Sequence, residues 1–333
     1  MLYLHGLGHF HPENIITNRF LAELDIGSSE DWILERVGIK TRRTILSLDY
    51  IRETRNRDIR AAQEASAYTS ADMAATASLM ALERAKLTVE DIGLVVSGST
   101  AAEHVCPAEA AAVAGRLGIT VPCFDINSAC STFGMQINVL SSMTPEALPP
   151  FVLVVTPESM TRVTDYSDRR SAPLFGDGAT AAVVSSQVPS RMEFLSGHYA
   201  SNTLSWDKVS VPRTGYFSQD GNAVQGFAIR KTTDMVKELQ KMYAVNGNRF
   251  IFVGHQANFG MLTTVCERCG ITDDHHWFNV DTYGNTGGAG APSVLSQHWE
   301  DIRPGDYIGI VVVGAGLTWA RVMLKVSDQR RPT

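Results

Sequence analysis

The stretch that decides the fold is Phe-Asp-Ile-Asn-Ser-Ala-Cys-Ser-Thr-Phe-Gly, residues 124–134. It runs from an apolar strand through small residues into a helix, and this order places Cys130 at or near the first turn of that helix. Unpaired N–H groups and the positive end of the helix dipole favour a thiolate there, and one N–H group can donate to an oxyanion. The pattern predicts a nucleophile. The alternative for any single cysteine is a buried structural role, to which we assign Cys106, Cys123 and Cys266.

Two later segments supply polar partners for that cysteine. Residues 250–258, Phe-Ile-Phe-Val-Gly-His-Gln-Ala-Asn, end an apolar strand in a turn, which positions His255 to face a cleft. Residues 283–290, Tyr-Gly-Asn-Thr-Gly-Gly-Ala-Gly, form a glycine-rich loop without the Lys-Ser/Thr ending of a phosphate loop. We therefore expect this loop to bring Asn285 into a crowded site. A further glycine-containing loop near the C-terminus links two apolar strands and can present backbone N–H groups.

Short apolar runs alternate with longer helical patterns, which is typical of a layered α/β fold. The expected strands are Gly93–Ser97, Cys123–Asn127, Phe151–Val155, Ala179–Ser185, Arg249–Val253, Tyr307–Val313 and Thr318–Val326. The expected helices are Ala71–Lys86, Ala108–Leu117, Cys130–Ser142, Ile229–Val245, Phe259–Cys269 and Ala291–Asp301. The polar stretch at 185–190 is the expected boundary between an N-terminal half, residues 1–187, and a C-terminal half, residues 188–333.

Composition narrows the class of protein. The 333 residues are 44% apolar and 19% charged, with a net charge of −6, and this acidic balance argues against a nucleic-acid-binding protein. No run of about 18 apolar residues is present, so we expect no membrane span. The N-terminus lacks the basic and then apolar layout of a signal peptide, and five cysteines make an odd number. We therefore expect a cytoplasmic protein without a disulfide framework.

The order of these segments resembles that of β-ketoacyl-[acyl-carrier-protein] synthase III over nearly the full chain. The residues that carry the resemblance are Asp125–Phe133, Leu174–Ala179, Gly254–Asn258, Tyr283–Thr286 and Gly314–Trp319. The resemblance implies a thiolase-like fold, a duplicated layered α/β sandwich, in a homodimer. It implies decarboxylative condensation of an acyl-CoA with a malonyl thioester, without a cofactor or a metal. The implied catalytic residues are Cys130, His255 and Asn285, with an oxyanion hole formed by the backbone N–H groups of Cys130 and Ala315.

Binding residues follow from the same resemblance. The segment Asp31–Ile39 is similar to one whose Trp and Arg hold CoA, so we expect Trp32 and Arg36 to bind CoA together with Arg162. Cys106 stands where the family often has a bulky Phe that limits acyl-chain length, which implies a roomier acyl pocket.

An acyl carrier protein is the expected macromolecular partner. Gln256 is the candidate residue for its docking, while Gly260 replaces a basic residue that the family often uses for this purpose. The segment Arg42–Arg60 carries six arginines interleaved with acidic residues. It is interpreted either as a solvated helix face with ion pairs or as a docking patch for an anionic carrier or a CoA phosphate.

Other functions stay open at this stage. A relative of the same fold can move an acyl group to a hydroxyl or an amine without decarboxylation. The chain order Cys, His, Asn also describes papain-like hydrolases, although the papain-type Cys segment is absent. Cys266 and Cys269, followed by His275 and His276, raise the hypothesis of a zinc site, but the spacing is not that of a finger. Fatty-acid initiation and a specialised pathway are equally compatible with the residues.

Overall fold

In the computed structural model, which describes residues 1–244 and 247–328, ten strands form one mixed sheet. Their order across the sheet is β12-β11-β13-β14-β8-β1-β7-β6-β4-β5. The strands of the first half are β1 (Leu2–Phe10), β4 (Leu94–Ser97), β5 (Cys123–Asp125), β6 (Val152–Ser159) and β7 (Asp177–Ser185). Those of the second half are β8 (Met192–Ser201), β11 (Phe250–Gly254), β12 (His276–Trp277), β13 (Tyr307–Gly314) and β14 (Thr318–Val326).

The two halves of the sheet repeat one topology. In each half the strands, numbered along the chain, lie in the order third, second, fourth, fifth, first. The first strands of the halves, β1 and β8, pair antiparallel and so join the repeats, with Leu2 opposite Phe194. The expected duplicated α/β architecture is therefore confirmed. The connection from β7 to β8 contains residues 187 and 188, and division of the chain at that point stays a prediction.

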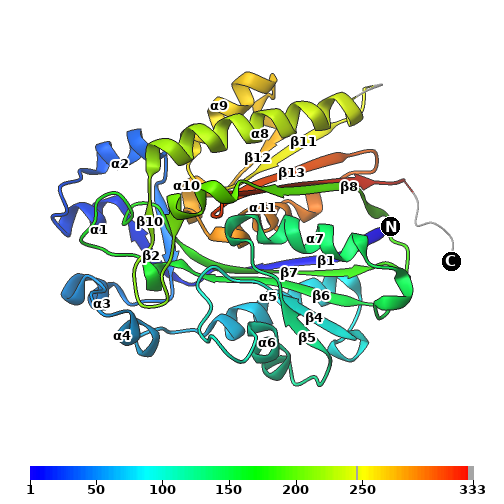
Figure 1. The fold of residues 1–333 in the computed structure, drawn as a ribbon, viewed down its shortest axis with the longest axis horizontal. Helices are drawn as coiled ribbons and strands as arrows, with labels where there is room; N and C mark the ends of the chain where they lie inside the picture. The colour runs from blue at the N-terminus through cyan, green and yellow to red at the C-terminus, as the bar shows by residue number, and fades with distance from the viewer. Residues whose placement is uncertain (245–246, 329–333) are drawn as a thin grey trace.

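Five layers result, because the halves of the sheet enclose two helices and each carries others outside (Figure 1). The enclosed helices are α7 (Thr132–Ser142) and α11 (Gly290–Gln297), whose apolar residues share one buried cluster with strands of both halves. The outer helices are α5 (Ser70–Ala85) and α6 (Glu109–Leu117) on one side and α8 (Gly221–Tyr243) and α9 (Phe259–Cys269) on the other. Among the described residues, none of these helices combines the length and apolarity needed to cross a bilayer.

Each enclosed helix begins with a 3₁₀ turn, Ala129–Ser131 before α7 and Gly287–Ala289 before α11. The two turns lie against each other at the centre of the molecule. The short helix α10 (Val280–Tyr283) leads into the second of them. The repeated fold therefore brings the start of both central helices to one place.

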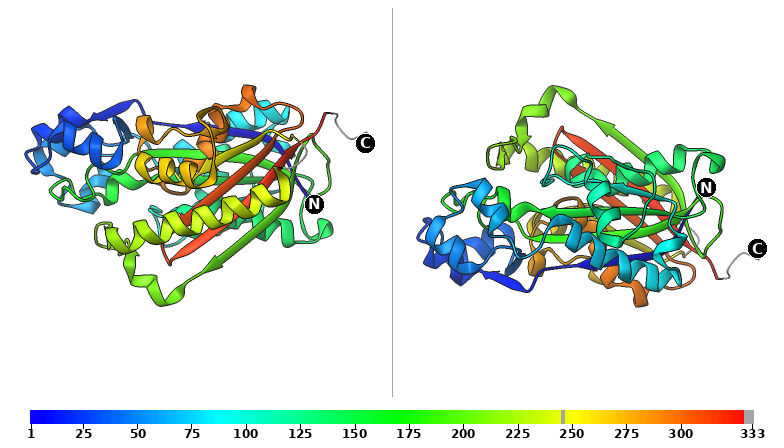
Figure 2. Two further views of the ribbon diagram at one scale, coloured as in Figure 1. Left: turned by 90° about the horizontal axis from the view of Figure 1, so that it is seen from above. Right: turned by 90° about the horizontal axis from the view of Figure 1, so that it is seen from below.

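A lobe of short elements covers one end of the sheet. It contains β2 (Asn14–Thr17), α1 (Asn18–Glu23), α2 (Glu30–Val37), β3 (Thr41–Thr44), α3 (Leu48–Thr54) and α4 (Ile59–Glu64). Figure 2 shows this lobe at the end of the molecule opposite the chain termini. Helix α2 begins where the Ser29 hydroxyl accepts a hydrogen bond from Trp32 N–H at 3.1 Å, and it ends at Gly38, which has a φ of +67°.

The expected strands and helices are present, with shifted ends. Helix α8 begins at Gly221, well before the expected Ile229, because Asp220 caps it by accepting a hydrogen bond from Ala223 N–H. Its expected end at Val245 lies outside the described residues. The segment Arg42–Arg60 is not one solvated helix face, because it spans β3, α3 and the start of α4 and buries Arg42 completely. A small hairpin, β9 (Val209–Ser210) and β10 (Ser218–Gln219), precedes α8.

Candidate active site

Cys130 lies in the sharp turn between β5 and α7. The turn is made by Ala129, which has a φ of +48° and whose N–H donates to Asn127 Oδ1 at 2.8 Å. The loop between β13 and β14 presses against it, since a Cβ atom at Gly314 would lie 3.0 Å from Cys130 N and 2.9 Å from Ser128 O. Only a glycine at residue 314 allows the two loops to approach this closely. The sequence-predicted strand-to-helix placement of Cys130 agrees with this geometry.

The electrostatic environment of Cys130 differs from the expectation. Burial raises the pKa of its thiol to about 12, the negative charge of Glu158 adds to this rise, and a backbone hydrogen bond only partly offsets it. Burial of the sulfur therefore opposes the thiolate that the helix N-terminus is expected to favour. The physical reason is that desolvation of a buried thiolate outweighs the short-range benefit of the first-turn N–H groups.

His255 follows the last residue of β11. Its N–H donates to Val311 O at 2.9 Å, which fixes the turn onto the neighbouring strand β13. The imidazole is buried, and its Nδ1 has no hydrogen-bond partner among the described residues. Burial lowers the pKa of His255 to about 4, so the ring is neutral near pH 7. A neutral imidazole offers one N–H donor without bringing a positive charge into the cavity.

Asn285 is held on both sides of its backbone. Its N–H donates to Leu174 O at 2.8 Å, and its carbonyl oxygen accepts from Gly176 N–H at 3.1 Å. The side-chain oxygen Oδ1 accepts from Gly287 N–H at 3.0 Å. Because this bond occupies the oxygen end of the amide, the Nδ2 hydrogens are what the side chain can offer to a ligand.

Cys130, His255 and Asn285 line the same cavity, which has a volume of about 530 Å³. Gly314 and Ala315 also line it, so the expected oxyanion donor at Ala315 lies close to the sulfur-bearing turn. The remaining wall is mostly apolar and comes from the loop before Asn285, the β9–β10 hairpin, α8 and α9. Its apolar members include Leu174, Phe175, Val209, Phe217, Phe227, Met261 and Leu317.

The cavity is lined by basic and aromatic side chains on one side. Trp32 and Arg36 of α2 are among the lining residues, as expected, together with Arg169 and Arg170. The guanidinium of Arg169 lies over the ring of Trp32, 4.1 Å from its centroid. Arg169 could not be identified from the sequence, because it lies far from α2 in the chain and no neighbouring residue indicates a contact with that helix.

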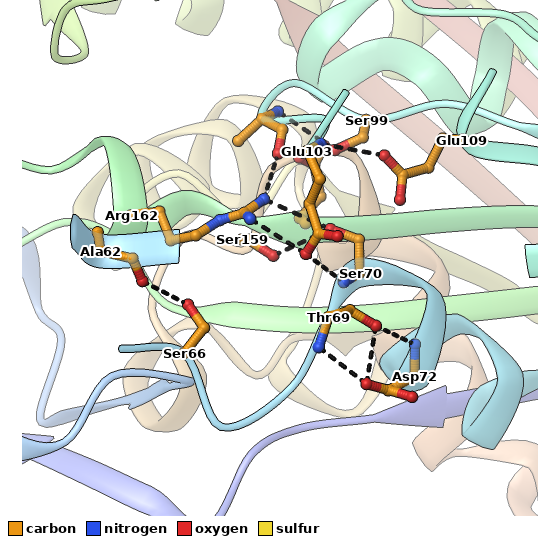
Figure 3. Close-up of polar contacts among 12 residues, drawn as sticks. Ala62, Ser66, Thr69, Ser70, Asp72, Ser99, Glu103, Glu109, Ser159 and Arg162 are labelled. Atoms are coloured by element: carbon orange, nitrogen blue, oxygen red, sulfur yellow. Dashed lines mark hydrogen bonds and ion pairs between the residues drawn. The ribbon is translucent and has the colours of Figure 1, made fainter. Parts of the chain in front are cut away.

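Arg162 is not at the cavity, and its prediction as a CoA ligand is wrong. Its side chain is 5% exposed and forms an ion pair with Glu103 at 3.1 Å. It also donates to Ala101 O at 2.8 Å. Figure 3 shows this guanidinium enclosed by Glu103 and Ser70 beneath the loop that follows β4. A guanidinium that is buried and paired in this way presents no surface on which a CoA phosphate could bind.

Two other predicted binding residues also lie away from the cavity surface. Gln256 is 0% exposed: its Nε2 donates to Gly254 O at 2.7 Å, and its Oε1 accepts from the N–H groups of Asn279 and Val280. It braces the turn after β11 and has no surface on which a carrier can dock, which corrects the docking prediction. Cys106 is exposed and does not line this cavity, so its effect on acyl-chain length stays a prediction.

The proposed zinc residues do not gather. Cys266 is buried in α9, and His276 is stacked against Phe252 and Phe278. Within residues 1–244 and 247–328, no group of three or more His, Cys, Asp or Glu side chains is arranged to hold a metal ion.

Glu158 is a residue near the site that the sequence did not single out. It is the penultimate residue of β6 and is 0% exposed. Burial raises the pKa of its carboxyl to about 7, although the N–H groups of Gly288 and Thr100 partly counter this rise by donating to it. A glutamate in an apolar strand gives no local sign of such a neighbourhood, because its donors come from distant loops.

A duplicated α/β fold in which a cysteine at a helix start, a histidine and an asparagine face one cavity defines a thiolase-fold condensing enzyme. The chain belongs to the β-ketoacyl-[acyl-carrier-protein] synthase III family. Residues 124–203 match the family model described as 3-oxoacyl-[acyl-carrier-protein] synthase III, and residues 250–326 match the model of its C-terminal part. Membership excludes the papain-like hydrolase, and the enzyme is a transferase.

Individual relatives match along nearly the whole chain. The β-ketoacyl-[acyl-carrier-protein] synthase III of Sulfurovum sp. strain NBC37-1 is 30% identical and aligns with 97% of this chain and 95% of its own. The crystal structure of 3-oxoacyl-[acyl-carrier-protein] synthase III from Aquifex aeolicus VF5 has a TM-score of 0.86 at 27% identity, covering 98% of this chain and 100% of that chain. The priming β-ketosynthase of the R1128 polyketide pathway has a TM-score of 0.81 at 26% identity, covering 99% and 97%.

Proposed function

We propose that this enzyme transfers an acyl group from CoA to Cys130 and then condenses it with a malonyl thioester, releasing CO₂. The observation that carries the proposal is the single cavity in which a thiol, a neutral imidazole and a carboxamide meet. The apolar wall suits an acyl chain and pantetheine arm, because such surface is better removed from water than left exposed.

The CoA nucleotide would bind beside Trp32 and the arginines. The Trp32 ring and the Arg169 guanidinium already stack at 4.1 Å, and a flat purine stacks on either of them. Arg36 and Arg170 also line the cavity and offer planar donors that suit phosphate oxygens. These arginines, rather than the segment Arg42–Arg60, are the candidates for the phosphates, since they are the ones that line the cavity.

In the first half-reaction, the Cys130 sulfur attacks the thioester carbonyl carbon. A new carbon–sulfur bond forms, the bond to the CoA sulfur breaks, and the thiol proton ends on the departing CoA thiol. The negative charge on the carbonyl oxygen would be held by the backbone N–H groups of Cys130 and Ala315. Such donors act strongly because the cavity wall is mostly apolar and because they are fixed before the reaction.

In the second half-reaction, the malonyl group loses CO₂ and becomes an enolate. His255 and Asn285 would each donate one hydrogen bond to its oxygen, and neither carries a charge that must be lost first. The enolate carbon then attacks the acyl carbon, the bond to Cys130 breaks, and the sulfur takes up a proton. Simple acyl transfer to a hydroxyl or an amine is the second candidate, but it needs no pair of neutral donors aimed at an enolate.

The acceptor and the assembly extend the proposal. We place the malonyl group on an acyl carrier protein or on CoA, since the relatives are named for the carrier. A homodimer is favoured by β5, which ends the sheet and leaves one strand edge unpaired, with Phe124 38% exposed on it. Fatty-acid initiation and a role like that of the priming ketosynthase both fit this chemistry.

The test is the substitution Asn285→Asp. A carboxylate at residue 285 would repel the enolate, so we expect CO₂ release from labelled malonyl thioester to fall by at least about 100-fold, since one oxyanion donor is typically worth about 2.7–4 kcal/mol. The acyl adduct on Cys130, measured by intact-mass spectrometry, should still form. Asn222→Asp, which adds the same charge elsewhere on the cavity wall, is the control and should retain CO₂ release. A mutant without an acyl adduct, beside an acylating wild type, would refute this division of roles.

A further inference from the structure

The Glu158 carboxylate is held by two loops. It accepts hydrogen bonds from Gly288 N–H at 2.8 Å, from Thr100 N–H at 2.9 Å and from the Thr100 hydroxyl at 3.0 Å. These donors and the Ser99 hydroxyl, which donates to Oε2 at 3.5 Å, are all neutral, and in the described part of the chain no ion pair of the carboxylate is formed. A fully buried carboxylate that is satisfied only by hydrogen bonds is costly to keep charged.

One of these loops carries Asn285. Gly287 N–H donates to Asn285 Oδ1 while the next N–H, that of Gly288, donates to Glu158. Gly287 has a φ of +55°, and a Cβ atom there would lie 2.7 Å from Glu158 Cδ, so the turn is packed directly onto the carboxylate. Consecutive N–H groups of one turn therefore hold Glu158 and Asn285, and the position of the carboxylate sets that of the amide.

The same turn touches the segment of the nucleophile. A Cβ atom at Gly288 would lie 3.2 Å both from Glu158 Oε1 and from Ala129 O, so this glycine packs against both the carboxylate and the residue before Cys130. A thiolate at Cys130 and a carboxylate at Glu158 would thus be two negative charges in one buried region. Like charges that share such a site resist simultaneous ionisation.

Few other ionisable groups face this pair. The loop after β4 leads to Glu103 and Arg162, which form an ion pair with each other. The glycine-rich turn 287–289 has no titratable side chain. His255 is neutral near pH 7, because burial lowers its pKa to about 4. For the charge at Cys130, burial is the largest cause of the raised pKa and Glu158 is the next.

We propose that Glu158 is a positioning residue with two linked effects: its carboxylate fixes the turn that carries Asn285, and loss of its charge eases formation of the Cys130 thiolate. The effect on the Cys130 thiolate is independent of the proposed function. The effect on the Asn285 turn rests on the proposed function, in which Asn285 acts in the second half-reaction. Before acylation a protonated Glu158 favours the thiolate. After acylation the sulfur is part of a neutral thioester, so Glu158 ionises freely and holds the Asn285 turn for the second half-reaction.

The charge effect is tested by alkylation of Cys130 with iodoacetamide from about pH 5.5 to about pH 10, followed by mass spectrometry on the peptide that contains Cys130. In the wild type the logarithm of the rate should rise with pH, flatten near pH 7 where Glu158 ionises, and then rise again. In Glu158→Gln the flattening should vanish. Above pH 8 the mutant should react about threefold faster, because about tenfold more thiolate is offset by a lower nucleophilicity.

Glu109→Gln is the matched control. Glu109 is also buried, and burial raises the pKa of its carboxyl as well, but it is not among the groups that act on Cys130. Its profile should follow the wild type. A folded Glu158→Gln protein with the wild-type profile, or an equal change in Glu109→Gln, would overturn the proposal. If Glu158→Gln fails to fold, the wild-type profile decides alone: a rise without flattening near neutral pH contradicts the coupling.

The positioning effect has its own readout. A glutamine at residue 158 keeps one acceptor oxygen, so it cannot accept at once from Gly288 N–H, now bonded to Oε1, and from Thr100 N–H, now bonded to Oε2. We expect CO₂ release by the pre-acylated Glu158→Gln enzyme to fall about tenfold, the cost of about one hydrogen-bond partner, while the acyl adduct forms at the wild-type rate or faster. Unchanged CO₂ release would overturn the positioning role. Because alkylation needs no acyl substrate, failure of condensation itself would leave the alkylation result intact.

Discussion

Single side chains decide which molecule this cavity accepts. The stacked pair of Trp32 and Arg169 joins helix α2 of the N-terminal lobe to the loop before Leu174, and both residues line the cavity. Neither side chain forms a hydrogen bond or an ion pair with Cys130 in the structure. Their contribution should therefore be to hold the non-reacting part of a thioester substrate, which is a contribution to substrate affinity and not to bond making.

We predict that Trp32→Ala and Arg169→Ala each raise KM for an acyl-CoA about tenfold, the loss expected for one desolvated cation–π or stacking contact. An acyl-pantetheine substrate lacks the nucleotide, so its KM should not change. Self-acylation of Cys130, followed by intact mass at varied substrate concentration, measures both. Trp206→Ala is the control, since Trp206 is 69% exposed and does not line the cavity. An equal rise in KM for both substrates would contradict nucleotide binding at this pair.

At this scale the sequence predicted the residues that carry local signals and missed those placed by tertiary contacts. Cys130, His255 and Asn285 each follow an apolar strand or a glycine, and such positions can be read from a short window. Arg162 and Arg169 are both arginines of one connection, and only the fold decides that one pairs with Glu103 while the other reaches Trp32. The pKa of Cys130 was misjudged for the same reason, because burial depends on the whole fold.

At the scale of elements, the site depends on loops that approach each other more closely than side chains allow. The β13–β14 loop touches the turn of Cys130 through Gly314, where no Cβ atom fits. The positions of His255, Asn285 and Cys130 are therefore determined by contacts between backbone atoms. Backbone contacts of this kind are stiff, which preserves the geometry that the proposed oxyanion hole needs.

We predict that Gly314→Ala displaces the Cys130 turn, because the added methyl group would overlap backbone atoms of Ser128 and Ser131 at 2.9 Å. Self-acylation should slow by about 100-fold, as expected for misplaced reacting groups, and the melting temperature should fall. Gly115→Ala is the control: Gly115 lies in α6 with open space around it, and alanine there should raise stability by about 0.5–1 kcal/mol. If Gly314→Ala acylates at the wild-type rate, the loop accommodates the added methyl group and the prediction is wrong.

The sequence predicted the continuous apolar strands and the long helices of the core, but not the strands β1 and β8 or the small elements around the core. Runs such as 307–313 and 318–326 are continuous and therefore unambiguous, and they became β13 and β14. Strand β1 was not predicted, because its glycines and histidines interrupt the apolar run and suit close packing against α5. The N-terminal lobe was also missed, since its helices are only one or two turns long and are stabilised by caps and tertiary contacts.

At the scale of the whole molecule, the sheet has two ends of different character. One ends at β12, a strand of two residues, and the other at β5, which bears the exposed Phe124. Strand β5 leads directly into the turn of Cys130, so a second copy paired there would lie next to the site.

We predict that Phe124→Asp shifts the enzyme from dimer to monomer, since it places a charge in the centre of the proposed strand pairing. Sedimentation velocity at a fixed protein concentration measures the change. Leu79→Asp is the control, because Leu79 is 57% exposed on the outer helix α5, away from β5, and its replacement should leave the dimer intact. A monomeric wild type, or a mutant that remains dimeric, would contradict pairing through this edge.

The two 3₁₀ turns that meet at the centre have a consequence for the history of the chain. One introduces α7 and holds the sulfur; the other introduces α11 and follows the carboxamide. An ancestor of half the present length, assembled with itself about a two-fold axis, would have presented the same turn twice. Fusion of the two copies into one gene would have freed each turn to evolve separately, so that one can now hold a thiol and the other can adjoin an amide in the same cavity.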